Sequence, residues 1–423
     1  MCLFDRRLGG RHREQFRRRL WVLLNSSLWL GALLLCLSLP AFARQELQGA
    51  DGTIPTGSLL PEMEPGSKSV TFQIGFYNQP DGPGDGNPFL DEALTVIEPI
   101  LIFDHDVSED FGYSIDLNYD FVSSASIDRL SNFPEQSGAS ADNYIGVDFS
   151  FRHRQENDDL FTWHAGYSVE YDYNSFGLGA SYAWQPDGKD AILTLGLDTY
   201  YDDLLLISGV DGTESGNGER LSLTVNADWY QILSPTLYGE FGASLAHQDG
   251  FLSTPYNFVV LEGGTTAPVP PLDNGALGEL VDETLPDSRT RLALYGRVRR
   301  QMTSGRAWEL GGRLYGDSWD IYSVSLEPAY IHALLPELLM EVSYRFYTQT
   351  AAEDFEENLF LGNTEEFRTQ DSDLGEFSSH TAGLALEWQR SKTNTLRAGI
   401  NYQLRSDGLD HFYGYIGWTR SVF

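Results

Sequence analysis

Charged residues recur at alternate positions of segments whose other positions are apolar. In FGYSIDLNYDF, 111–121, Asp116 and Asp120 alternate with aromatic and aliphatic residues. The acidic candidates of this kind are Asp116, Asp120, Asp148, Glu170, Asp198, Asp228 and Glu240, and the basic ones, all in the second half of the chain, are Arg297, Arg313, Arg345 and Arg397. Two opposed sets of charges along a pore could orient small polar solutes. The alternative is that they form ion pairs between neighbouring strands and fill an interior.

Residues for covalent or metal chemistry show no recognisable arrangement. Beyond residue 43 the histidines are His105, His153, His164, His247, His332, His380 and His411, and none has a Ser/His/Asp or metal-site spacing. The two cysteines, Cys2 and Cys36, lie in an amino-terminal segment that we expect to be removed. Neither disulfides nor thiolate ligands are therefore expected, and the sequence predicts no catalytic residue, metal or cofactor.

The segments that carry the charges have a period of two. Strict alternation of apolar and polar residues, as in 144–154 and 160–173, indicates strands longer than those of globular proteins. A tilted strand that crosses a membrane needs roughly 9 to 11 residues. About sixteen such strands are expected, near 69–77, 93–103, 111–122, 143–154, 160–173, 176–185, 190–201, 220–232, 236–247, 289–301, 307–318, 321–333, 338–349, 379–389, 395–405 and 411–423.

The connections between these segments alternate in length. The even-numbered ones are short, namely HDVSED, ENDD, PDGK, SPT, MTSGR, LPE and SKTN, whereas the long ones, 78–92, 123–142, 202–219, 248–288 and 350–378, all fall at odd positions. Outer-membrane barrels oppose short periplasmic turns to longer external loops, with an even strand count and both termini in the periplasm. The sequence therefore predicts an all-β fold, a transmembrane antiparallel up-and-down β-barrel in the bacterial outer membrane, in contact with lipid and lipopolysaccharide.

The two ends of the chain carry export signals. Arginines, an apolar run from Leu20 to Leu39 and an Ala-Phe-Ala site at 41–43 indicate a cleaved signal peptide, residues 1–43, with a retained anchor as the alternative. Residues 44–68 form a polar periplasmic lead-in, and 69–423 form the barrel. The chain ends on Phe423 in an aromatic-rich strand. This resembles the terminal signal by which the barrel assembly machinery recognises its substrates.

Composition limits the partners of the chain. A formal net charge of −33 makes nucleic acid a poor partner, and 13% aromatic residues in regular patterns argue against disorder. After residue 43 no run approaches the roughly 20 apolar residues of a membrane helix. Tryptophans near the ends of the expected strands suit interfacial girdles, namely Trp163, Trp184, Trp229, Trp308, Trp388 and Trp418.

Two long loops have features of their own. Segment 248–288 contains the apolar run Phe258 to Leu261, and it could fold inward as a constriction or form a mobile surface loop. Loop 350–378 is strongly acidic, with Arg368 as its one basic residue. It could hold divalent cations at the lipopolysaccharide surface through carboxylate oxygens, although a solvated acidic loop is the favoured interpretation.

Three stretches together resemble a widespread family of predicted bacterial outer-membrane barrels of unknown function. They are NYDFVSSASID (118–128), YGDSWDIYSVSLEPAY (315–330) and SYRFYTQTAAEDF (343–355). The matching positions are Asp120 with Ser124, Ala125 and Ser126, then Asp317, Trp319 and Asp320, and then Arg345, Tyr347, Gln349, Ala351, Ala352 and Phe355. The chain departs from the family by inserting Glu353 before Asp354 and by lacking a Tyr after Phe355. The resemblance implies a porin-like barrel and its location, and it implies no activity.

These features predict an outer-membrane channel for the passive diffusion of small polar solutes. A preference for cations is expected because a negative mouth concentrates them. The alternatives are a barrel component of a surface polymer export or surface-assembly complex and, less favoured, an outer-membrane enzyme.

Overall fold

The computed structural model describes residues 59–82, 85–124, 142–269, 271–272 and 274–422. The regular elements of these ranges are strands, apart from one 3₁₀ turn, η3 (Ser372–Leu374). No helix of the described part is long and apolar enough to span a membrane. The expected signal peptide, residues 1–43, lies outside the described residues, as do 44–58 of the lead-in, Ala125, Ser126 and Phe423.

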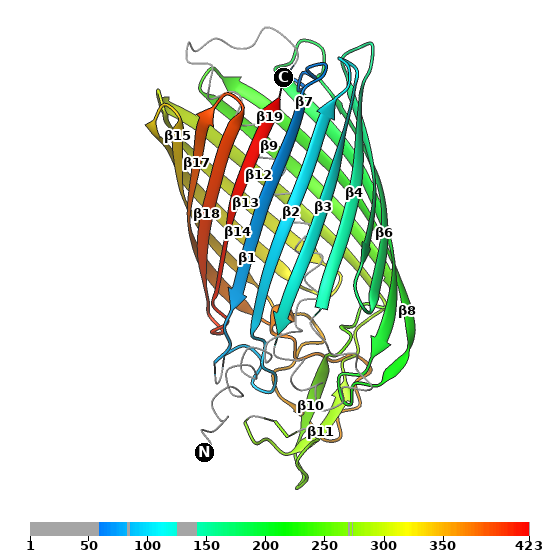
Figure 1. Ribbon diagram of the computed structural model, residues 1–423. Helices are drawn as coiled ribbons and strands as arrows, with labels where there is room; N and C mark the ends of the chain where they lie inside the picture. Colours follow the sequence, from blue (N-terminus) through cyan, green and yellow to red (C-terminus); the bar gives the residue numbers. More distant parts are fainter. Residues whose placement is uncertain (1–58, 83–84, 125–141, 270, 273, 423) are drawn as a thin grey trace, which may run out of the picture.

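Sixteen strands form one closed antiparallel barrel (Figure 1). They are β1 (Lys68–Gln79), β2 (Leu94–Asp106), β3 (Phe111–Ser124), β4 (Asp142–Arg154), β5 (Leu160–Val169), β6 (Tyr173–Trp184), β7 (Ala191–Ile207), β8 (Glu214–Ser234), β9 (Leu237–Gly250), β12 (Ser288–Thr303), β13 (Arg306–Asp317), β14 (Tyr322–Leu335), β15 (Leu338–Gln349), β17 (Phe377–Ser391), β18 (Asn394–Arg405) and β19 (His411–Val422). Each pairs with the next barrel strand, and β1 closes the ring against β19 from Lys68↔Val422 to Asn78↔Phe412. The predicted up-and-down barrel is confirmed.

Three of the expected strand boundaries were wrong by several residues. Strand β5 ends at Val169, so Glu170 lies in a connection and not in a strand. Strands β7 and β8 continue to Ile207 and from Glu214, which reduces the expected long connection 202–219 to residues 208–213. The extra pairs, such as Asp203↔Glu219 and Leu204↔Gly218, involve polar residues and glycines. The alternation of apolar and polar residues ends before these residues, so the sequence predicted shorter strands. The backbone pairing of β7 and β8 nevertheless continues past the apolar part of the wall.

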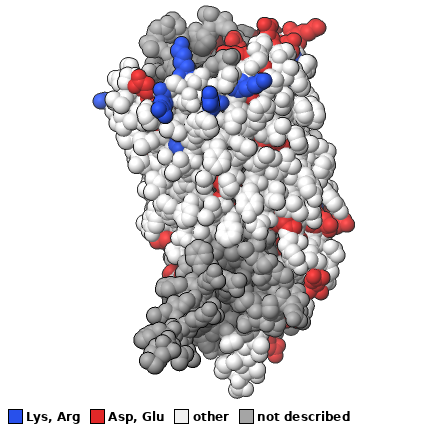
Figure 2. All heavy atoms as spheres, in the orientation of Figure 1, with Lys and Arg blue, Asp and Glu red and all other residues white. Residues whose placement is uncertain are grey.

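The alternation of side chains separates an apolar outer face from a polar inner face. Large apolar side chains are exposed at every second position, for example Phe72, Ile74 and Phe76 on β1 and Leu384, Leu386 and Trp388 on β17. In Figure 2 the middle of the wall shows few charged atoms, which gather towards the two ends. A closed barrel with such a surface is stable in lipid because every backbone group is paired.

The short turns and the long loops lie at opposite ends of the barrel (Figure 1). The turns are 107–110, 155–159, 185–190, 235–236, 304–305, 336–337 and 392–393, and we refer to their end as the periplasmic rim. At the other end the long loops contain a three-stranded sheet of β10 (Phe258–Glu262), β11 (Gly278–Asp282) and β16 (Leu359–Phe360), in the order β11-β10-β16. The apolar run of 248–288 is therefore an ordered strand and not a mobile loop.

Candidate functional site

The inner wall from β4 to β8 carries a chain of polar side chains centred on His164. His164 Nδ1 lies 3.1 Å from Asp148 Oδ2 on β4, and its Nε2 lies 2.9 Å from Asp198 Oδ1 on β7. Asn226 on β8 donates to the other Asp198 carboxylate oxygen at 3.2 Å. A protonated imidazole donates from both nitrogens, so one histidine satisfies two carboxylates. Sequence reasoning missed this bridge, because the only signal was the place of His164 on the polar parity of its strand.

The His164 bridge crosses β6 at a glycine. Gly179 is paired in register with His164 on one side and with Asp198 on the other. A Cβ atom at this position would overlap both His164 Nε2 and Asp198 Oδ1. Polar side chains cover other inward glycines in the same way, as Asn118 does at Gly146. These side chains therefore lie along the wall instead of projecting across the barrel.

Arginines of the other half of the wall, β12 to β18, pair with carboxylates of adjacent strands. The pairs are Arg297 and Arg299 with Glu309, Arg345 with Glu327, and Arg397 with Glu387, with N–O distances of 3.1, 2.6, 2.9 and 2.7 Å. Arg313 on β13 differs, because it is exposed and forms no ion pair with any described residue. Within the described ranges no arginine of this half forms an ion pair with an acidic residue of β2 to β9. Most inward arginines of this half are therefore paired with a carboxylate of a neighbouring strand, and Arg313 is not.

The carboxylates of β2 and β3 are not balanced in this way. Among the described residues, Glu98 Oε1, Asp116 Oδ1 and Asp120 Oδ1 are buried oxygens without a hydrogen-bond partner. Asp116 also lies directly opposite Asp148 in the β3–β4 register. Arg152 on β4 is a basic residue close to this group in the sheet, but it forms ion pairs with Asp104 and Asp106 at 2.7 and 3.2 Å.

All but one of the residues predicted as a pore lining occupy inward positions of strands. Asp116, Asp120, Asp148, Asp198, Asp228, Glu240, Arg297, Arg313, Arg345 and Arg397 alternate with exposed apolar residues. Asp148 and Asp198 meet through His164, and Asp228 accepts a hydrogen bond from Tyr295 at 2.5 Å. Glu170 is the exception, because β5 ends before it. The role of these residues in solute passage stays a prediction.

Loops 80–93, 208–213, 251–287, 318–321, 350–376 and 406–410 pack together at the loop end, and we call their described residues the cap. Phe89, Phe258, Val260 and Leu272 form one buried cluster, against which Val210 packs. Phe89 lies between β1 and β2 and Val210 between β7 and β8, and the four strands β3 to β6 separate these loops in the barrel. A cluster that joins them therefore extends across the mouth.

Two fully enclosed glutamates tie the loops of the cap to one another. Glu92 accepts hydrogen bonds from Asn87 N at 2.7 Å and from Ser372 Oγ at 2.8 Å. Glu283 accepts from Thr369 Oγ1 at 2.5 Å and from Thr254 N at 2.9 Å. Burial raises the pKa of Glu92 to about 8 and also raises the pKa of Glu283. Both contacts join loop 350–376 to other loops, so buried carboxyl groups hold these loops of the cap together.

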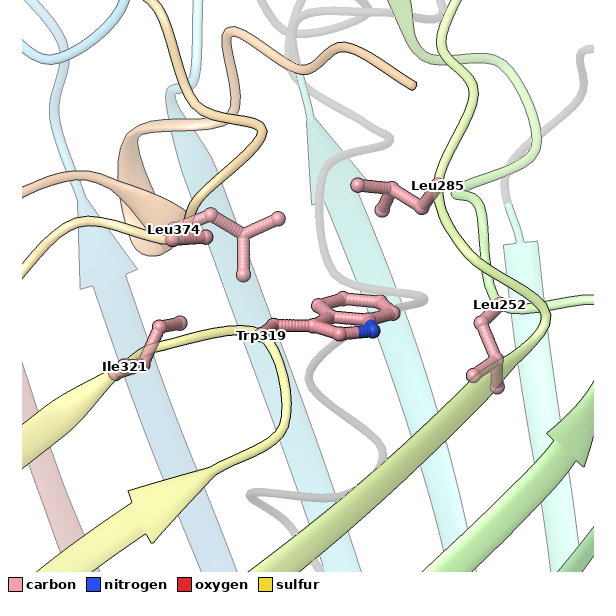
Figure 3. Packing of buried hydrophobic residues seen from close by; sticks show 6 residues of the cluster. Leu252, Leu285, Trp319, Ile321 and Leu374 are labelled. Carbon is pink, nitrogen blue, oxygen red and sulfur yellow. The ribbon is translucent and has the colours of Figure 1, made fainter. Parts of the chain in front are cut away.

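A second cluster closes the base of the cap around Trp319. Figure 3 shows Trp319 between Leu252, Leu285, Ile321 and Leu374. The indole Nε1 donates to Ser288 O at 3.0 Å, and the Arg289 guanidinium lies 4.1 Å from the ring centroid. Arg289 in turn pairs with Asp317. The cluster thereby fixes the connection between β13 and β14 to two other loops, 251–287 and 350–376.

The described residues do not meet the requirements of a metal site. In the part of the chain that the structure describes, no group of three or more His, Cys, Asp or Glu residues could hold a metal ion. Within loop 350–376, Glu353, Glu356 and Glu366 are exposed and Asp371 is half-buried. A divalent-cation site in this loop therefore stays without support.

A family model with the description "Protein of unknown function (DUF3570)" matches residues 141–419, which is more than half of the 423-residue chain. The chain belongs to this family. Several residues that carried the resemblance, Trp319, Ala352 and Phe355, meet in the cluster at the base of the cap. With its apolar outer face and closed ring, this DUF3570 protein is a β-barrel of the bacterial outer membrane. No curated protein matches its sequence.

Solved outer-membrane proteins have a similar barrel. A bacterial polysaccharide outer-membrane secretin aligns with TM-score 0.46 and 10% identity over 84% of this chain and 98% of its own. The outer-membrane protein opdK of Pseudomonas aeruginosa aligns with TM-score 0.40 and 10% identity over 86% and 100%. The siderophore receptor PirA of Acinetobacter baumannii aligns with TM-score 0.44 and 10% identity over 81%, and the chain spans only 53% of that receptor. Similarity at this level concerns the overall barrel and not the residues inside it or the function.

Proposed function

We propose that this barrel is a channel for the passive diffusion of small polar solutes and that it prefers cations. The observation that supports this most is the uneven balance of charge on the inner wall. Glu309, Glu327 and Glu387 on β13, β14 and β17 are paired with arginines, whereas Glu98, Asp116 and Asp120 on β2 and β3 retain buried oxygens without a described partner. The inner surface of β2 to β9 is therefore a region of negative potential, which concentrates cations along a pore.

The wall chemistry supports diffusion more than catalysis. Both ring nitrogens of His164 are occupied by carboxylates, so neither is left to activate a hydroxyl group. Polar side chains lie across inward glycines, an arrangement that suits a wide polar passage. An enzyme in this barrel is accordingly the least favoured of the three possibilities.

Planar-bilayer recording of the refolded barrel tests the proposal. We expect steady single-channel conductance, and in a salt gradient the reversal potential should have the sign of cation preference. Anion preference, or conductance that does not depend on the inner-wall carboxylates, would contradict it. The variant Asp228→Asn tests this dependence, because it removes an inward carboxylate and should reduce the cation preference.

The cap favours a second candidate, a gated barrel of an export or surface-assembly complex. Its clusters join loops from separate parts of the ring, so the mouth is covered in the state that the structure shows. A folded barrel that stays silent in the bilayer, and conducts only after the cap is loosened, would support this candidate. Recognition of Phe423 by the barrel assembly machinery also stays a prediction.

A further inference from the structure

The periplasmic rim carries basic residues along one arc of adjacent strands. In sheet order the arc runs β12-β13-β14-β15-β17-β18-β19-β1. Its outward basic residues are Arg300, Arg306, Arg390, Lys392, Arg420 and Lys68, all of them exposed. Figure 2 shows Lys and Arg atoms gathered at the upper end of the barrel, the end at which β19 finishes. Below them the wall is the apolar band that faces lipid.

These basic residues have no ion-pair partner in the described part of the chain, whereas the inward arginines almost all have one. Glu337 is the only acidic residue in the three turns of the arc, 304–305, 336–337 and 392–393. The turns of the other arc carry Glu109, Asp110, Glu156, Asp158, Asp159, Asp187 and Asp190. The rim is therefore positive on one side and negative on the other.

Tryptophans lie next to three of these cations, on the side that faces the middle of the membrane. Arg306, Arg390 and Arg420 are each two residues from an outward tryptophan, namely Trp308, Trp388 and Trp418. In the sheet, Arg300 lies opposite Trp308, and Trp388 and Trp418 flank the same residue, Leu396. Tryptophan rings settle at the level of lipid headgroups. The guanidinium groups one step further out are then at the level of the phosphates.

We infer that this basic arc is a binding surface for anionic phospholipid headgroups of the periplasmic leaflet. Arginine binds phosphate through two parallel N–H donors, which a surface with few competing carboxylates leaves free. The acidic arc repels the same lipids, so they collect on one side of the barrel only. This inference concerns the outward face of the periplasmic rim and does not depend on whether the barrel conducts.

Lipid retention measures this preference directly. The full barrel is placed in nanodiscs of phosphatidylethanolamine with a minor share of phosphatidylglycerol, released into detergent, and its retained lipids are counted by native mass spectrometry. We expect phosphatidylglycerol to be enriched over its share in the nanodisc. The variant Arg306→Ser, Arg390→Ser, Arg420→Ser should reduce that enrichment by at least about fivefold, the effect of one cation at an anionic surface.

Matched variants separate charge from other effects. Replacing the same three arginines by lysine keeps the charge and should keep most of the enrichment, and Lys189→Ser on the acidic arc should leave it unchanged. Equal enrichment in the wild type and the serine variant would overturn the inference. If the serine variant does not fold, the wild type alone decides, because its enrichment must fall as salt is raised.

A second copy of the chain is the competing occupant, since the acidic arc of one barrel is complementary to the basic arc of another. The same mass spectra would then show dimers or higher oligomers that the serine variant loses, without enrichment of phosphatidylglycerol in either. That result would also overturn the lipid assignment.

Discussion

Gly179 is the residue that lets His164 reach across β6 to Asp198. The methyl group of an alanine at this position would overlap His164 Nε2 and Asp198 Oδ1, so the bridge must break or the strands must shift. We expect Gly179→Ala to lower the free energy of unfolding by about 1–2 kcal/mol, because it leaves partly buried polar groups without partners. Denaturant unfolding in lipid vesicles, followed by tryptophan fluorescence, measures the difference.

Gly196 on β7 is the matched control. It also faces inward, but the nearest atom to a Cβ there is Asn226 Cβ at 3.7 Å, an ordinary contact distance. Gly196→Ala should change stability little. If the two substitutions destabilise equally, the loss of glycine in a strand and not the broken bridge is the cause.

Arg313 is an exposed inward arginine without an ion pair to a described residue, and this makes it the sharpest test of selectivity. Removing its charge should make the inner wall more negative where ions pass. We expect both Arg313→Ala and Arg297→Ala to increase the ratio of cation to anion permeability. The effect should be larger for Arg313, because Arg297 shares Glu309 with Arg299. Unchanged reversal potentials in both variants would place these residues outside the ion path.

The period of two fixed which side chains face inward, but it could not pair them. Arg297 and Glu309 meet because β12 and β13 are neighbours in a register that depends on the whole sheet. The partners of His164 are 16 and 34 residues away along the chain, and the second is two strands away in the sheet. Such contacts carry no local signal, which is why the inward acidic residues were predicted and their histidine was not.

Barrel strands were predictable because lipid imposes alternation over their full length, whereas the cap has no such constraint. Strand β10 is a short apolar run that periodicity cannot distinguish from a buried turn or helix. Strand β16 has only two residues, and it is defined by parallel pairing with β10 far away in the chain. The family resemblance gave a better signal, because Trp319 and Ala352 are both buried at the base of the cap.

The cap should respond to pH through Glu92. Its pKa is about 8 in the closed cap, mainly because of burial, with Asp373 raising it and Arg405 lowering it. The closed cap therefore holds a proton that an exposed glutamate releases near its ordinary value of 4.5. Between these values the closed state binds more protons, so its stability is complete at acid pH and falls as pH rises. The slope is at most about 1.4 kcal/mol per pH unit for one group.

Hydrogen exchange of the amides in 86–93 and 369–374 between pH 5 and 8, corrected for intrinsic rates, measures this loss. Glu92→Gln, which stays neutral, should weaken the pH dependence in 86–93, and Glu283, whose pKa is also raised, should keep part of it in 369–374. Glu376→Gln changes an exposed glutamate of loop 350–376 and is the control. A wild-type cap whose opening does not depend on pH in this window would show that Glu92 is not the proton-binding group.

On the scale of the whole molecule, charge and length of the connections define two unlike ends. The cap covers the loop end, and the periplasmic rim divides into a basic and an acidic arc. Between them the wall offers lipid an apolar surface around the whole ring. The orientation in the membrane follows from these ends, because short turns of such barrels face the periplasm.

Cysteine labelling on intact cells tests this orientation, since the only cysteines of the chain, Cys2 and Cys36, lie in the segment expected to be cleaved. Val269 in the cap is 76% exposed, and Ser304 is exposed in the turn between β12 and β13. A polyethylene-glycol maleimide too large to cross a pore should label Val269→Cys on intact cells and label Ser304→Cys only after the outer membrane is opened. The unsubstituted protein should stay unlabelled in both conditions, and labelling there would show that residues 1–43 are retained. The reverse pattern for the two variants would show that the barrel has the opposite orientation. The basic arc would then face lipopolysaccharide phosphates instead of the periplasmic leaflet.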